Sequence, residues 1–251
     1  MGKIAGLSGT LSGKIGTMVF TKGEDGVSYA KSYQPQVANP RTRAQLVQRA
    51  KMNLAGRISA LVPKRILALG EVSSRRNRSA FNKSLLGLIK VDTSDPSIYQ
   101  ARIDPADIVF AKGAEVSHAT VSTPTVTSRQ FTMQLSLMDA ELSNRYGERI
   151  VVMVTTTKEK GGISGVAHAD VLLTNTTAQN VTIELPFEIA DGDMVTVSRS
   201  PFILSQEGAG IVTTGVFNNT TDALASILKN PRNVRGWGFT LPVMKSVFTQ
   251  A

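Results

Sequence analysis

The pattern of apolar and polar positions changes once along this chain, between about residues 92 and 116. Before that region, apolar residues recur every three or four positions, which is the spacing of one helix face. After it, short runs of Val, Thr and Ile alternate with polar residues, which is the period of a half-buried strand. The chain is therefore expected to be α+β, with a helical region followed by a mostly β region.

Residues 1–37 predict a Gly-rich arm followed by a β-hairpin. Residues 1–13 are rich in Gly and Ser and predict a flexible arm without a fixed element. From Lys14 to Tyr33, β-forming residues flank the tetrapeptide at 23–26, Gly-Glu-Asp-Gly, which is typical of a turn. Two strands joined by this turn are expected.

Residues 38–92 predict a basic helical pair. Asn39 and Pro40 suit the N-cap and the first position of a helix, and Pro63 is expected to end or kink it. The apolar stripe of this first helix consists of Leu46, Ala50, Leu54, Ile58 and Leu61. A second helix is predicted over about 75–89, with an inner face of Ala80, Phe81, Leu85, Leu86 and Ile89. Two amphipathic helices this close in sequence are expected to pack together.

Residues 93–115, punctuated by Pro and Gly, predict an irregular linker, and residues 116–201 predict a β-sandwich-like domain. Its six expected strands are 118–122, 130–137, 149–156, 163–173, 179–185 and 193–200. Short strands separated by regular turn signals are typical of an immunoglobulin-like β-sandwich. Because the chain has no cysteine, the Cys…Trp…Cys hallmark is absent and only the architecture is predicted.

Residues 202–251 predict a C-terminal extension with weaker patterns. A strand is expected over 210–217 and a short helix over 222–228. Residues 233–239, which contain the only Trp of the chain, predict a loop packed on the rest of the protein.

The composition is that of a folded protein, with 41% hydrophobic and 19% charged residues among 251. The absence of cysteine excludes disulfides, thiolate metal ligands and a cysteine nucleophile. The first twenty residues lack the continuous apolar run of a signal peptide, and no stretch has the roughly 18–20 apolar residues that span a bilayer. We therefore expect a protein that is not exported by a signal peptide and has no membrane partner.

Charge is distributed unevenly along the chain. Residues 1–91 have a formal charge of +13, whereas residues 92–251 have −4, and residues 27–70 contain no Asp or Glu. Such a basic segment attracts polyanions, so nucleic acid is the expected partner. The bases expected to contact phosphates are Arg41, Arg43, Arg49, Lys51, Arg57, Lys64, Arg65, Arg75, Arg76, Arg78 and Lys83.

The arrangement of these bases favours contact with phosphates over reading of bases. Arg75, Arg76 and Arg78 precede or open the second helix, where backbone N–H groups also favour phosphate. On a helical wheel the bases of the first helix scatter, and Arg43 and Arg57 fall near the apolar stripe. No zinc-finger, RNP or helix-turn-helix signature is present. A merely solvated basic surface is the alternative interpretation.

Catalytic and cofactor patterns are weak. The segment 6–14 lacks the glycine and the Ser/Thr of a phosphate-binding loop, because Ser8 and Ile15 occupy those positions. His118 and His168 stand in predicted strands without a partner at ligand spacing. The pair Asp191 and Asp193 suits a turn better than a calcium loop. A non-enzymatic protein without metal or cofactor is expected.

Several short motifs carry a resemblance: SGKIG at 12–16, VANPRT at 37–42, AQL at 44–46, QRAK at 48–51 and AFN at 80–82. With these motifs the chain resembles an uncharacterised family, classed as a domain of unknown function, from gut-type bacteria and their phages, including tailless single-stranded-DNA phages. The resemblance covers residues 9–82 and is one of pattern only in the β half. It implies a non-enzymatic, virion- or genome-associated phage protein, located in the virion or in the cytoplasm of the bacterial host, and identifies no functional residues.

Two functions are expected from these observations. The first is non-specific nucleic-acid binding, to single-stranded DNA, through the basic N-terminal third, with the β domain docking on itself or on a capsid protein. The alternative is a structural assembly module, in which the arm and hairpin add strands to the sheet of a capsid protein or another acidic partner. A carbohydrate-binding sandwich would require export and is the least favoured.

Overall fold

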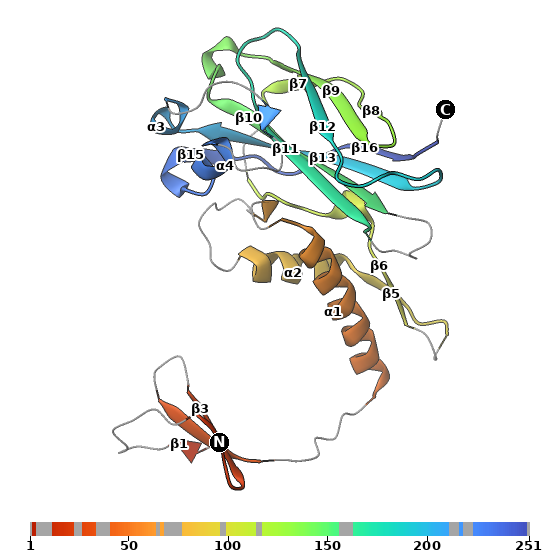
Figure 1. Cartoon of the computed structure of the whole chain (residues 1–251), viewed down its shortest axis with the longest axis vertical. Helices are drawn as coiled ribbons and strands as arrows, with labels where there is room; N and C mark the ends of the chain where they lie inside the picture. The colour runs from red at the N-terminus through yellow and green to blue at the C-terminus, as the bar shows by residue number, and fades with distance from the viewer. Residues whose placement is uncertain are drawn as a thin grey trace. The chain divides into compact units, whose positions relative to one another are not determined.

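The computed structural model of the protein describes residues 2–3, 12–22, 27–33, 41–63, 66–67, 77–95, 99–113, 117–155, 163–210, 216–217 and 223–249. Within these residues the protein is α+β and mostly β, with several antiparallel sheets (Figure 1). Packing divides the chain into two compact units, Met1–Thr42 and Arg43–Ala251.

The N-terminal unit is a four-stranded antiparallel sheet of order β1-β4-β3-β2. Its strands are β1 (Gly2–Lys3), β2 (Gly13–Ile15), β3 (Met18–Lys22) and β4 (Ser28–Ser32). The predicted hairpin is present as β3 and β4, although its turn at 23–26 lies outside the described residues.

The N-terminal sheet is larger than the predicted hairpin. Strand β2 adds a second hairpin through Gly16 and Thr17, and Gly16 has a φ of +58°, a conformation that glycine adopts without strain. In the segment predicted as a flexible arm, Gly2 pairs with Ala30. That part of the prediction is wrong, because backbone pairing can order a segment with little side-chain content.

The second unit begins with helices α1 (Arg43–Leu61) and α2 (Asn77–Leu88), which pack against each other, and with the ribbon of β5 (Lys90–Asp92) and β6 (Gln100–Arg102). Both predicted helices are confirmed. The expected cap residues at 39–40 lie outside the described part of the chain.

The inner faces of the helices differ from the prediction at two positions. Leu61 is 40% exposed and Val62 is buried instead, since Val62 continues the four-residue spacing of Leu54 and Ile58. Ala80 is also exposed, because Phe81, Leu85 and Ile89 define the buried line of α2.

Two antiparallel sheets form the β region. The larger has the order β14-β11-β10-β13-β15, with β16 also paired to β13. Its strands are β10 (Tyr146–Thr155), β11 (Gly165–Leu172), β13 (Met194–Leu204), β14 (Val216–Phe217), β15 (Val234–Trp237) and β16 (Leu241–Val247). The smaller contains β7 (Ala119–Val121), β8 (Thr125–Val126), β9 (Gln130–Leu137) and β12 (Gln179–Glu184). All six strands predicted within 116–201 are present.

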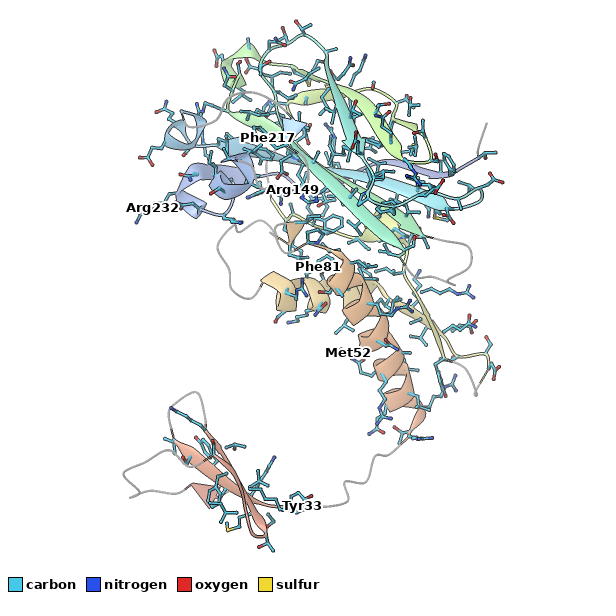
Figure 2. The ribbon with its side chains drawn as sticks, viewed as in Figure 1. Tyr33, Met52, Phe81, Arg149, Phe217 and Arg232 are labelled. Atoms are coloured by element: carbon cyan, nitrogen blue, oxygen red, sulfur yellow. The ribbon has the colours of Figure 1, made fainter. Side chains whose placement is uncertain are left out.

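The larger sheet lies between two cores. One face shares a core with the smaller sheet, where alternate residues such as Phe131, Leu135 and Val181 meet Ile150 and Val152. The other face packs against the helices, and Figure 2 shows Phe81 of α2 below this sheet. Because β10 is covered on both faces, it is buried almost throughout.

Residues 93–115, which the sequence assigns to a linker, supply part of the second core. Ile103, Ile108 and Phe110 are buried there. The prolines mark local turns within this packed segment: Pro105 opens a short 3-10 helix, Pro105–Asp107, whose N-cap Asp104 accepts a hydrogen bond from the Ala106 N–H at 3.0 Å.

The C-terminal extension packs on the edge of the larger sheet. The predicted loop at 233–239 is wrong, since β15 pairs with β13 and brings Trp237 opposite Phe202. The predicted helix is present as α4 (Ala223–Ile227), and β16 was not predicted. The remaining short elements are α3 (Gln206–Ala209) and the 3-10 turns Ala140–Leu142 and Pro231–Asn233.

Candidate nucleic-acid interface

Seven of the eleven predicted phosphate-contacting bases fall within the described residues. Lys51 is half-buried, and the exposed ones are Arg41, Arg43, Arg49, Arg57, Arg78 and Lys83. Lys64, Arg65, Arg75 and Arg76 lie outside the described residues. Arg41 belongs to the N-terminal unit, so the helices of the second unit carry the other six.

Helix α1 carries four of the seven described bases, namely Arg43, Arg49, Lys51 and Arg57. Its buried face is formed by Leu54, Ala55, Ile58 and Ser59, so the exposed Arg49 and Arg57 lie on the rest of its circumference. Their Cα atoms are separated by about 12 Å along the helix axis, at 1.5 Å per residue. This separation suits contacts with different phosphates of one strand.

Arg43 has a specific partner within the protein. Its guanidinium donates a hydrogen bond to Thr93 Oγ1 at 2.8 Å, which ties the first turn of α1 to the residue that follows β5. Although Arg43 is exposed, one of its nitrogens has this structural role. The sequence alone did not indicate the contact, because the two residues are fifty positions apart.

Two further exposed bases of the second unit were missed by the sequence analysis. Lys90 and Arg102 are exposed and stand directly opposite each other in the β5–β6 ribbon, which packs against α1. Their alternation with apolar residues in the two short strands was the available signal. We call Arg49, Lys51, Arg57, Arg78, Lys83, Lys90 and Arg102 the helical basic surface.

Two acids of this region, Asp92 and Asp104, accept hydrogen bonds. Hydrogen bonds from the Ser94 hydroxyl and N–H, with a contribution from Arg102, lower the pKa of Asp92. A hydrogen bond from Lys245 lowers the pKa of Asp104. Helices α1 and α2 themselves contain no Asp or Glu. Their exposed charge is therefore entirely positive, which favours contact with a polyanion.

A buried polar cluster lies at one end of the core between the sheets. Glu148 Oε1 accepts hydrogen bonds from Tyr146 Oη at 2.6 Å and from Arg199 Nη1 at 3.2 Å. The backbone N–H of His118 donates to Tyr146 Oη at 3.0 Å, and Arg199 also donates to the Ala119 carbonyl at 3.2 Å. The cluster thus ties the start of β7 to β10 and β13.

Burial controls the chemistry of this cluster. Glu148 is fully buried, and loss of hydration raises its pKa to about 7, although Arg199, Tyr146 and Ser117 oppose the shift. Burial and the Glu148 carboxylate together raise the pKa of Tyr146. A strongly perturbed carboxyl is a general mark of functional sites. Here the side chain has no exposed surface for a substrate, and its contacts join structural elements.

The two histidines lie apart. His118 packs the edge of its ring against Tyr146, with ring centroids 5.8 Å apart, whereas His168 is fully buried on the helix-facing side of β11. Among the residues that the structure describes, no group of three or more His, Cys, Asp or Glu side chains could hold a metal ion.

A second buried ion pair supports the C-terminal extension. Arg149 Nε lies 2.6 Å from Asp170 Oδ1, both side chains are almost completely buried, and the guanidinium lies 4.9 Å from the centre of the Trp237 ring. Figure 2 shows Arg149 within the larger sheet. The pairing explains how these charged residues are accommodated in the core, and Arg149 also makes a cation–π contact with Trp237.

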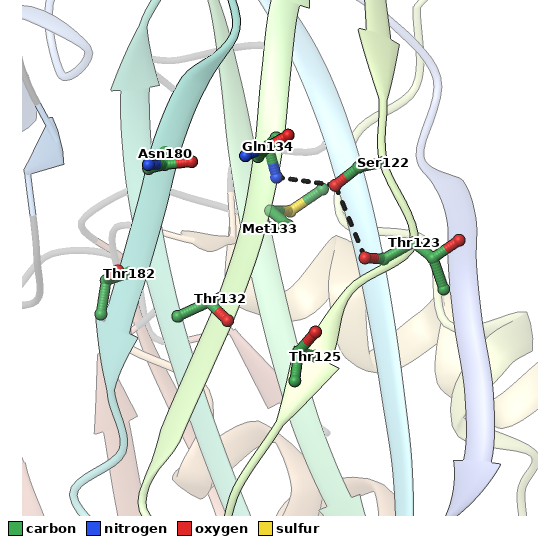
Figure 3. Close-up of a pocket in the computed structure, with 8 residues that line it drawn as sticks. All are labelled: Ser122, Thr123, Thr125, Thr132, Met133, Gln134, Asn180 and Thr182. Carbon is green, nitrogen blue, oxygen red and sulfur yellow. Dashed lines mark hydrogen bonds between the residues drawn. The ribbon is translucent and has the colours of Figure 1, made fainter.

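A hollow of about 580 Å³ lies on the outer face of the smaller sheet (Figure 3). It forms beside residues 122–124, which connect β7 and β8 at the edge of the smaller sheet; both strands pair with β9. There Ser122 Oγ accepts a hydrogen bond from the Gln134 N–H at 2.8 Å. Its lining is Ser122, Thr123, Thr125, Thr132, Met133, Gln134, Asn180 and Thr182. This neutral lining can offer hydrogen bonds but no charge.

No protein-family profile matches this chain, and a comparison with curated proteins finds no match. No helix in the described ranges is both long and apolar enough to cross a membrane. The chemistry of the surface is therefore the basis for assigning a function.

Proposed function

We propose that the protein is a non-catalytic, phage-type protein that binds nucleic acid, chiefly single-stranded DNA, without sequence preference. The helical basic surface carries the proposal, because two acid-free helices carry exposed cations and the adjoining ribbon adds the opposed Lys90 and Arg102. Each cation placed near a phosphate releases condensed counterions, which supplies affinity that does not depend on base sequence.

The composition of the surface favours backbone contact. Its exposed cations include Arg49, Arg57 and Arg78, and arginine can contact phosphate oxygens through two N–H groups at once. Sequence reading would need an element shaped to enter a groove with side chains aimed at base edges. The scattered bases on α1 suit contact with a flexible strand better than such a fixed arrangement.

The experiment is a salt titration of DNA binding by the full chain and by the triple variant Arg49→Gln, Arg57→Gln, Arg78→Gln. We expect weaker binding for all sequences alike and a log–log salt slope smaller by about two to three, because each substitution leaves one phosphate without its cation. Arg129→Gln is the matched control, since Arg129 is 74% exposed in an ion pair with Glu188 on the smaller sheet. Equal affinity of wild type and triple variant would show that the helical basic surface does not bind DNA.

A second candidate function is assembly, favoured by the apolar face of the N-terminal sheet. Ile15 is 58% and Met18 is 43% exposed, and strand register puts both on one face with Phe20 and Ala30. An uncovered apolar sheet face is typical of an interface, here with a second copy or a capsid protein. Native mass spectrometry tests this: a discrete oligomer free of nucleic acid supports assembly, and a monomer at all concentrations argues against self-assembly.

Two finer assignments belong to the same proposal. From β9 to β13 the chain crosses repeatedly from one sheet to the other, because β9 and β12 belong to the smaller sheet and β10, β11 and β13 to the larger one. This alternation supports an immunoglobulin-like sandwich as the architecture of this region. A genome-binding role supports a location in the virion or in the cytoplasm of the bacterial host. Peptide mass spectrometry of purified particles would detect the protein if it belongs to the virion.

A further inference from the structure

The N-terminal sheet has two chemically different faces. Side chains alternate along a strand, so Tyr29, Lys31 and Tyr33 point to one side of β4 and its continuation. The ladder continues past β4, because the Tyr33 N–H donates to the Thr17 carbonyl at 2.6 Å. This face is opposite to the apolar face that carries Ile15.

Strand register brings further cations to the tyrosines. Lys31 stands opposite Val19, which stands opposite Lys14, so the two lysines flank one apolar position across three strands. The Lys14 Nζ lies 3.5 Å from the centre of the Tyr33 ring. We call Lys14, Tyr29, Lys31 and Tyr33 the lysine–tyrosine face.

This face is accessible, and its charged side chains among the described residues are basic. Tyr33 is 42% exposed, Lys14 and Lys31 are exposed, and Tyr29 is half-buried. The described residues of the N-terminal unit include no Asp or Glu. Figure 2 shows Tyr33 at the end of this sheet.

We infer that the lysine–tyrosine face binds single-stranded nucleic acid, with bases stacking on tyrosine rings and phosphates contacting the lysines. Aromatic rings set among cations on a sheet are the combination that accepts unpaired bases. The inference rests on the proposed function and deepens it, because base stacking on this face would strengthen the preference for single-stranded over duplex DNA beyond what charge contacts supply.

The Lys14–Tyr33 contact defines how a base would dock. The ammonium group covers one face of the ring, so a base can stack only on the other face. The cation–π contact also restricts the ring, which lowers the entropy cost of binding. Duplex DNA offers no free base face, so it gains only the charge contacts of this sheet.

The test compares Tyr33→Leu and Tyr33→Phe in the full chain, using a single-stranded oligo-dT and a duplex of mixed sequence. We expect Tyr33→Leu to lower the affinity for oligo-dT about tenfold, with an unchanged salt slope and unchanged duplex binding. Tyr33→Phe keeps the ring and should bind like wild type. In contrast, Lys31→Gln should lower the salt slope by about one.

The outcomes separate this inference from the proposed function. If Tyr33→Leu binds oligo-dT like wild type, or weakens duplex binding equally, base stacking on this face is wrong while genome binding stands. If wild type binds neither DNA at low salt, or elutes only as an oligomer that binds an acidic protein, the proposed function itself fails.

A photocrosslink gives a readout that does not depend on the folding of any variant. Wild-type protein irradiated with 5-bromodeoxyuridine oligonucleotide should give a crosslinked peptide that contains Tyr29 or Tyr33. Crosslinks confined to residues after Thr42 would overturn the inference.

Discussion

At the residue scale, Glu148 is a fully buried carboxyl group with one cationic partner, Arg199. Its Oε1 atom accepts hydrogen bonds from Tyr146 and Arg199, whereas Oε2 has no hydrogen-bond partner among the described residues. The single favourable charge of Arg199 does not offset the loss of hydration, so the pKa is raised to about 7 from its ordinary value near 4.5.

This raised pKa predicts a pH-dependent stability. Between about pH 4.5 and 7 the folded protein holds a proton that the unfolded chain releases, so the contribution of Glu148 to the free energy of unfolding falls as pH rises through that range. Glu148→Gln removes the titration and should gain stability relative to wild type as the pH is raised from about 5 to 8. Urea unfolding at the two ends of this range measures the difference in the free energy of unfolding, and the exposed Glu188→Gln is the control. If the free energy of unfolding depends on pH equally in Glu148→Gln and wild type, the raised pKa of Glu148 is wrong.

Two glycines predict opposite effects of the same substitution. A Cβ at Gly147 would lie 2.4 Å from Phe202 Cζ and 2.5 Å from the Val171 carbonyl oxygen, so Gly147→Ala should cost about 1–3 kcal/mol or more. Gly56 is exposed in α1 with no atom within 4 Å, so Gly56→Ala should stabilise by about 0.5–1 kcal/mol. Thermal unfolding of the two variants checks both signs, and destabilisation by Gly56→Ala would contradict the structure of α1.

At the element scale, α1 and α2 are held by a core that they share with the larger sheet. Ile58 and Phe81 are fully buried, and the Phe81 ring stacks on Phe110 with centroids 5.8 Å apart. The same packing fixes which sides of the helices remain exposed, so it also positions the helical basic surface.

The packing of α1 gives a matched pair of substitutions. Ile58→Ala should destabilise the protein by about 2–5 kcal/mol through a cavity, whereas Leu61→Ala, three residues on and 40% exposed, should cost much less. Denaturant unfolding measures both, and similar effects of the two substitutions would mean that the buried face of α1 is wrong. If Ile58→Ala also weakens DNA binding at temperatures where it is folded, the helices position the cations as proposed.

Much of the element order was predictable from local pattern, because alternation and helical spacing act within a few residues. The strands carrying Phe131 and Val181 and the helix carrying Leu54 follow such patterns. The positions of Trp237 in β15 and of Phe110 in the predicted linker were not predictable in this way, because their partners are distant in sequence. Trp237 pairs with Phe202, and Phe110 stacks on Phe81.

At the scale of the whole molecule, the two units differ in how much apolar surface they bury. Of the described residues in Met1–Thr42, only Ala30 is a buried hydrophobic, whereas Arg43–Ala251 contains three buried clusters. The N-terminal sheet therefore depends chiefly on backbone pairing, and sheets of this size usually need a covering layer.

This difference predicts a difference in amide hydrogen exchange. Amides of β3 and β4 should exchange faster than those of β10 and β13, because local opening is easier where little apolar surface is buried. Mass spectrometry of exchange in the free protein measures this, and equal protection would show that the sheet is covered. Added oligo-dT should slow exchange around β4, with β12 as an unaffected reference.

The candidate interface was only partly predictable. Charge asymmetry places the candidate bases in the first third of the chain, and Arg49, Arg57 and Arg78 are exposed there. The pairing of Lys90 with Arg102 could be found only from the register of the β5–β6 ribbon, because the sequence shows where cations occur but not which residues lie beside them in space. In the same way, the meeting of Lys14 with Tyr33 depends on three-strand pairing.

Genome binding by the helical basic surface is tested most directly by the salt dependence of single-stranded DNA binding, measured for wild type and for the Arg49→Gln, Arg57→Gln, Arg78→Gln variant. We expect a wild-type log–log slope of several units, and a smaller slope with weaker binding for the variant at every sequence tested. The absence of wild-type binding at low salt, or identical slopes for the two proteins, would contradict it.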